Sequence, residues 1–144
     1  MAVTPIPEGY HTATPYLIVT DADALLRFVT AAFQATVVED HRDPNGRVVH
    51  ADVLVGDSHI MLGQANEQWK AQPGTVLLYV PDADATYAAA LAAGATSVQE
   101  MTTQFYGDRS GGVEDPSGVT WWISTHVEDV SREELARRMA AARR

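Results

Sequence analysis

An internal repeat is the feature that most constrains the fold of this chain. The segment Thr14-Pro-Tyr-Leu-Ile-Val-Thr-Asp-Ala-Asp-Ala24 returns as Thr75-Val-Leu-Leu-Tyr-Val-Pro-Asp-Ala-Asp-Ala85. In both copies an alternating apolar run leads to an aspartate and then to a helical pattern, which is typical of a strand followed by an N-capped helix. Self-similarity at a long fixed offset indicates a duplicated structural unit. We therefore expect equivalent positions of the two halves to carry the functional groups.

Size and composition argue against several classes of protein. The chain has 144 residues, enough for one domain or two small fused modules with a buried core. Its net charge of -9 argues against a nucleic-acid partner, which would need a basic face. The apolar runs are too short to span a membrane, and residues 1–10 lack the basic start of a signal peptide. Without cysteine there is no thiol nucleophile or thiolate metal site, and we expect a cytoplasmic protein.

Each copy of the repeat opens a longer pattern of one strand, one helix and three strands. In the first half we expect strands at 14–19, 36–41, 47–55 and 58–62 and a helix at 22–33. The turn Asp43-Pro-Asn-Gly46 is a strong hairpin signal between two of these strands. In the second half we expect strands at 75–80, 96–101 and 119–124, a glycine-rich strand within 105–114, and a helix at 83–93 that ends at Gly94. The pattern is βαβββ, twice.

These elements divide the chain into four parts. We expect a first βαβββ module at 12–64, a linker at 65–74, a second βαβββ module at 75–126 and a capped C-terminal helix at 127–144. The capping box Ser131-Arg-Glu-Glu134 opens that helix. We interpret its arginines, at 137–138 and 143–144, as a solvated surface.

The duplicated modules, with aspartate at each helix start and Asp115-Pro-Ser-Gly118 before the last strand, resemble the vicinal oxygen chelate superfamily. Its members include glyoxalase I, extradiol dioxygenases, fosfomycin-resistance enzymes and bleomycin-resistance proteins. The motifs His50-Ala-x-x-x-x-Gly56-Asp57, Tyr106-Gly-Asp-Arg-Ser110 and Thr125-His-Val-Glu-Asp-Val-Ser131 are similar to its PhnB-like branch. The resemblance implies an α+β fold, in which two tandem modules form a curled mixed sheet shaped as a cup, plus a short C-terminal helix.

The resemblance also implies where a metal would bind. In superfamily members that use one, four side chains from the first and last strands of the modules hold a divalent ion. These positions fall here on Thr14, Met61, Thr75 and Trp122. Such an ion prefers carboxylate oxygens and imidazole nitrogens to hydroxyl, thioether and indole groups. We therefore predict that the ancestral metal site is absent and that no cofactor is needed, with a divalent metal on displaced ligands as the alternative.

Strand alternation predicts the side chains that line the cup. We expect seven residues to bind the ligand: Thr14, Tyr16, His50, Met61, Thr75, Tyr79 and Trp122. Aromatic groups with a few hydroxyls suit a flat or amphipathic small molecule. In the other interpretation, the aromatic side chains fill the cup and nothing binds. Trp121 has the opposite parity, and we expect it in the core.

His50 is the one candidate catalytic residue, with Asp52 as its candidate orienting partner. In the other interpretation, His50 is a strand histidine bonded to a backbone carbonyl or lying at a dimer contact. Arg109, between Asp108 and Glu114, is interpreted as part of a structural ion pair.

Two functions remain open, and each predicts a small-molecule partner. The first is a metal-free protein that sequesters a small aromatic or cationic molecule, as bleomycin-resistance relatives do. The second is an enzyme, either a metal-dependent lyase, isomerase or dioxygenase with displaced ligands or a metal-free catalyst that uses His50. A domain that binds another protein is a third interpretation. The resemblance implies a homodimer, in which modules pair within one chain or swap between chains.

Overall fold

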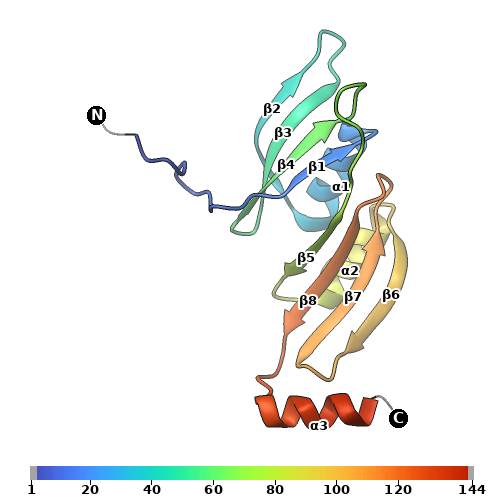
Figure 1. Ribbon diagram of the computed structural model, residues 1–144. Helices are drawn as coiled ribbons and strands as arrows, with labels where there is room; N and C mark the ends of the chain where they lie inside the picture. The colour runs from blue at the N-terminus through green and yellow to red at the C-terminus, as the bar shows by residue number, and fades with distance from the viewer. Residues whose placement is uncertain (1–2, 143–144) are drawn as a thin grey trace.

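Two units with the same order of elements make up most of the computed structural model, which describes residues 3–142 (Figure 1). The first unit contains β1 (Tyr16–Val19), α1 (Ala22–Phe33), β2 (Thr36–Arg42), β3 (Val48–Val55) and β4 (Ser58–Gln64). The second contains β5 (Thr75–Tyr79), α2 (Ala83–Ala92), β6 (Thr96–Thr103), β7 (Asp108–Glu114) and β8 (Thr120–His126), and α3 (Arg132–Ala142) follows it. The duplicated βαβββ pattern is confirmed.

Each unit forms one mixed sheet of four strands. Sheet 1 has the order β1-β4-β3-β2 and sheet 2 the order β5-β8-β7-β6. In both, the first and last strands of the unit pair in parallel and the other pairs are antiparallel. Helix α1 packs against β3 and β4, and α2 packs against β7 and β8, so each sheet has one face covered by its own helix (Figure 1). We call the opposite side of each sheet its open face.

The strand register preserves the repeat. Tyr16 pairs with Met61 in sheet 1, and Leu77 pairs with Trp122 in sheet 2. Tyr16 and Leu77 are separated in the sequence by the same number of residues as Thr14 and Thr75, and so are Met61 and Trp122. Met61 and Trp122 are therefore equivalent positions of the two modules.

The helix starts and the buried strand faces follow the sequence pattern. The side chains of Asp21 and Asp82 accept hydrogen bonds from the backbone N–H groups of Ala24 and Ala85, at 3.0 and 3.1 Å. These bonds satisfy N–H groups that have no partner within the helix. The covered sides supply one hydrophobic core that includes Leu17, Val19, Leu78, Trp121 and Ile123. Trp121 lies fully in this core, as expected.

The two modules meet mainly through their helices. Helix α1 contacts α2, and the ring of Phe33 at the end of α1 lies 4.8 Å from the ring of Trp121 in β8. The two sheets share no strand pairing in the part of the chain that the structure describes. The expected fold class is confirmed, but the sheets do not close into one cup within this chain.

The C-terminal helix lies outside this core. As the capping box predicts, Ser131 Oγ accepts the backbone N–H of Glu134 at 3.1 Å. Arg138 fixes the helix to the second module through the carbonyl of Phe105 and the carboxylate of Glu128. The arginines at 143–144 lie outside the described residues. Within residues 3–142, no helix combines the length and the apolar character needed to cross a bilayer.

Candidate functional site on the open sheet faces

The open face of sheet 1 carries a buried carboxylate. Asp52 of β3 is only 1% exposed, and it accepts the hydroxyl of Tyr10 and lies 3.0 Å from Nδ1 of His59. The ring of Tyr10 stacks on the ring of His59, with centroids 3.8 Å apart. The hydrogen bond to Asp52 raises the pKa of Tyr10 to about 12. The segment before β1 therefore covers part of this open face.

These contacts correct the expectation that Asp52 orients His50. The carboxylate of Asp52 is engaged by Tyr10 and His59 instead. His50 lies beside two other rings, at centroid distances of 5.6 Å from Tyr16 and 5.9 Å from His41. Asp52 therefore does not orient His50 as a general base in this structure.

Tyr16 and His50 share a cavity of about 490 Å³ at the open face of sheet 1. Trp69, from the segment between the modules, forms another wall of this cavity. The side chain of Asn66 accepts the backbone N–H of Trp69 at 2.7 Å, which holds this segment in a closed turn. The ring of Tyr16 lies close over Gly63, where a Cβ atom would be 2.9 Å from it. The result is a concave surface in which the rings of Tyr16, His50 and Trp69 lie among aliphatic and amide side chains.

The open face of sheet 2 is also aromatic, with a buried acid at one end. Trp122 lies so close to Gly112 that a Cβ atom there would be 2.5 Å from the indole ring. The hydroxyl of Tyr79 donates to Asp108 at 2.8 Å, and Nδ1 of His126 lies 2.9 Å from the same carboxylate. The bond to Asp108 raises the pKa of Tyr79, and Asp108 together with Asp129 raises the pKa of His126.

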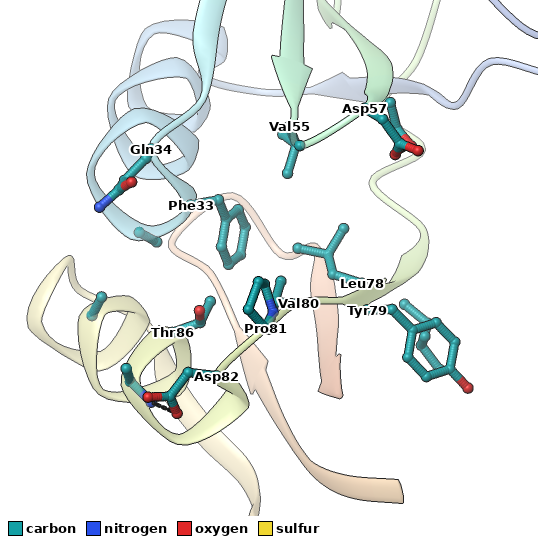
Figure 2. Close-up of a pocket in the computed structure, with 16 residues that line it drawn as sticks. Phe33, Gln34, Val55, Asp57, Leu78, Tyr79, Val80, Pro81, Asp82 and Thr86 are labelled. Carbon is teal, nitrogen blue, oxygen red and sulfur yellow. Dashed lines mark hydrogen bonds between the residues drawn. The ribbon is translucent and has the colours of Figure 1, made fainter. Parts of the chain in front are cut away.

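A third concave region lies at the junction of the modules (Figure 2). This cavity of about 630 Å³ is bounded by the end of α1, the turn between β3 and β4, strand β5 and the start of α2. Figure 2 shows Phe33, Leu78 and Val80 among its walls. Its Asp82 carboxylate already caps α2. Sequence patterns did not predict this cavity because its walls come from both modules.

The seven predicted ligand-binding residues are divided between the two sheets. Sheet 1 carries Tyr16, His50 and Met61, with Thr14 just before β1, and sheet 2 carries Thr75, Tyr79 and Trp122. Tyr16 and His50 line the 490 Å³ cavity, Tyr79 lines the junction cavity, and Thr14 lines a smaller cavity of about 140 Å³. None of these three cavities holds more than two of the seven residues.

Arg109 forms an ion pair, as expected, but its partner is neither Asp108 nor Glu114. Its guanidinium lies 3.0 Å from the carboxylate of Asp84 in α2. Arg109 lowers the pKa of Asp84, because its hydrogen bonds favour the charged carboxylate. The pair joins β7 to the helix on its covered side, which is a structural role.

The family model of the Glyoxalase/Bleomycin resistance protein/Dioxygenase superfamily matches residues 10–123. The chain belongs to this superfamily. An uncharacterized protein of Mycobacterium bovis is 32% identical over 139 residues, which cover 89% of this chain and 91% of that protein. An uncharacterized protein of Mycobacterium tuberculosis has the same identity over 139 residues, covering 89% of this chain and 82% of its own length.

Two solved structures share the fold. TioX from Micromonospora sp. ML1 has a TM-score of 0.67 and 24% identity, covering 80% of this chain and 99% of TioX. A PhnB protein from Bacillus cereus, described as a putative 3-demethylubiquinone-9 3-methyltransferase, has a TM-score of 0.61 and 19% identity, covering 80% of this chain and 99% of that one. At these identities, the likeness concerns the fold alone.

At the four positions where the family resemblance would place a metal, the side chains do not suit a divalent ion. Met61 and Trp122 are equivalent in register, and they offer a thioether and an indole. Thr14 and Thr75 offer hydroxyls. Neither pair supplies the carboxylate or imidazole that such an ion requires.

Proposed function

We propose that this protein binds and sequesters a small, flat aromatic or cationic molecule, without a metal at the superfamily's four positions. The equivalence of Met61 and Trp122 carries this proposal, because two soft, apolar side chains stand where a metal-using relative needs ligands. A thioether and an indole favour contact with an aromatic ring. The presence of Met61 and Trp122 at these positions thus disfavours metal binding and favours contact with an aromatic ligand.

A cavity elsewhere on the open face of sheet 1 and the charge of the chain support the same class of ligand. The 490 Å³ cavity is of the size that small-molecule sites have, and Tyr16 and Trp69 line it. The net charge of -9 attracts cations over long range. Tyrosine and tryptophan faces also bind cations directly.

Catalysis by His50 is the alternative function. His50 is half-buried and lines the cavity, where it would be within reach of a bound molecule. Its candidate orienting partner, Asp52, is bonded to Tyr10 and His59. We favour binding for that reason. An enzyme of this kind would lose turnover in His50→Ala.

We further propose that a second copy of this chain completes each binding cup. The predicted ligand-binding residues lie on two sheets that do not close over each other in one chain. Tyr16, Leu77 and Tyr79 on the open faces are at least half exposed. Pairing sheet 1 of one chain with sheet 2 of another would cover these side chains and bring both halves of the site together.

Removal of the Trp122 indole tests the ligand proposal. In calorimetric titrations with a panel of flat aromatic cations, including acridine dyes, we expect Trp122→Ala to weaken binding about 10-fold, the value of one good aromatic contact. Tyr87→Ala is the control, because Tyr87 lies on α2, bonded through its hydroxyl to Ser97. Equal affinity in the wild type and Trp122→Ala would contradict the aromatic platform.

A charge on the open face tests the homodimer. Leu77 on β5 is 51% exposed, and we expect Leu77→Asp to convert a dimer to a monomer in sedimentation velocity, because burying the new charge is unfavourable. Leu91→Asp is the matched control, since Leu91 is an exposed leucine on α2. A monomeric wild type, or dissociation by Leu91→Asp alone, would count against this interface.

A further inference from the structure

Three metal-ligating side chains gather on the open face of sheet 1, away from the superfamily's four positions. Glu39 and His41 belong to β2, and His50 belongs to β3. Each offers one ligand atom, and these atoms all lie within 4.8 Å of one another. Within residues 3–142, this is the one such group of three or more histidine, cysteine or acidic residues. We propose that Glu39, His41 and His50 bind a divalent cation of the zinc class.

The β2–β3 hairpin places these side chains together. His41 pairs with His50 across the two strands, and Glu39 pairs with Asp52. Paired residues project to the same face, so Glu39 and His41 share the open face with His50 and the buried Asp52. Asp40, between the two ligands, and Arg42, after them, bond to each other at 2.8 Å, and Arg42 lies 3.5 Å from Asp23 of α1 on the covered side.

The hairpin is itself well fixed. Oδ1 of Asp43 accepts the backbone N–H groups of Asn45 and Arg47 at 2.8 and 3.0 Å. A further bond joins the N–H of Gly46 to the carbonyl of Asp43 at 2.9 Å. This turn, together with the register shift between Arg42 and His41, brings His41 opposite His50. Ligands on rigid strands are positioned more accurately than ligands on loops.

The donor set suits zinc. Two imidazole nitrogens and one carboxylate oxygen are the protein ligands of many zinc sites in which water or a bound molecule takes the fourth position. Nε2 of His41 already lies 3.3 Å from Oε1 of Glu39, close to the separation of about 3.4 Å expected for two ligands of a tetrahedral ion. The side chains of Glu39 and His41 are 60% and 65% exposed, which leaves them free to rotate toward His50.

An ordinary surface ion pair does not explain the whole group. A Glu–His pair on an exposed strand contributes little stability, and it needs no third ligand atom. His50 stands opposite, and it also lines the 490 Å³ cavity. A cation held here would lie at the border of that cavity. The metal site does not depend on the proposed aromatic ligand, because the ion can be measured alone.

Zinc titration of the chelator-treated, full-length protein tests the site. We expect one zinc ion per chain by calorimetry, and His41→Ala and His50→Ala should each weaken binding roughly 100-fold or more, beyond the loss typical of a residue that only orients a ligand. Glu39→Gln should weaken it less, because the amide oxygen remains. His11→Ala is the control, as an exposed histidine outside the group.

Cobalt(II) provides a second readout, which reports the coordination of the bound metal directly. Bound in place of zinc, it should show the intense visible absorption of four-coordinate cobalt, lost in His41→Ala and retained in His11→Ala. Circular dichroism should confirm that all variants fold. Absence of zinc binding to the wild type, or unchanged binding in the His41→Ala and His50→Ala double variant, would overturn the proposal. Neither result bears on the Trp122 test.

Discussion

Replacing Trp121 with alanine is expected to lower the free energy of unfolding by about 3–5 kcal/mol. Trp121 is the largest of the fully buried side chains in the described part of the chain, and its ring packs against Phe33 at the end of α1. Alanine would leave a cavity between β8 and that helix. Because the contact joins the two modules, the loss should affect both of them in one transition, measured by urea denaturation.

A buried hydrogen bond adds to this effect. The indole N–H of Trp121 donates to Oδ2 of Asp115 at 2.7 Å, and Asp115 is only 4% exposed. Burial raises the pKa of Asp115, although the indole and the backbone N–H groups of Ser117 and Val119 favour its charged form. Removing the indole takes one of these donors from a carboxylate that is almost fully buried. This places the expected loss at the upper end of the range.

Trp122 provides the matched comparison, since it is the next residue and points to the opposite face. It is only half-buried, and it lies over Gly112 on the open face. We expect Trp122→Ala to cost about 1 kcal/mol in the same denaturation experiment. Equal losses from the two substitutions would contradict the assignment of Trp121 to the core and Trp122 to the open face.

The contrast between these tryptophans shows what sequence patterns predict well. Alternation along a strand and the spacing of apolar residues along a helix are both local properties of the sequence. The opposite orientations of Trp121 and Trp122 and the helix at 22–33 could therefore be predicted directly from the sequence. The strand register then preserved the offset of the repeat, which made Met61 and Trp122 equivalent. These features depend on neighbouring residues and on one duplication.

Contacts between distant segments were not predictable in the same way. Closure of the cup depends on how two modules dock, and here they meet through helices rather than through sheets. Tyr10 reaches Asp52 from an irregular segment with no periodic pattern, and Trp69 joins the cavity from the linker. For Glu39 and His41 a signal did exist. Their alternation, beside an Asp-Pro-Asn-Gly turn with His50 beyond it, indicates one face of a hairpin.

The turn between β6 and β7 gives the second large expected effect, through Gly107. Its φ is 102°, in the left-handed region, and a Cβ atom there would overlap the carbonyl oxygen of Glu128. The carbonyl of Gly107 accepts the N–H groups of Val127 and Glu128 at 2.9 and 3.0 Å. This glycine is therefore where the segment leading to α3 is attached to the second module.

We expect Gly107→Ala to destabilise the protein by about 2–4 kcal/mol, because backbone strain and displacement of the 127–130 segment add together. Gly46→Ala is the control: Gly46 has a φ of 81°, but nothing lies within 4 Å of an added Cβ. It should cost about 1 kcal/mol, from the left-handed backbone alone. Urea denaturation of both variants measures the difference. Equal losses of unfolding free energy in the two variants would contradict this prediction. They would show that the close contact with Glu128 adds no cost, because the segment leading to α3 moves to accommodate the methyl group.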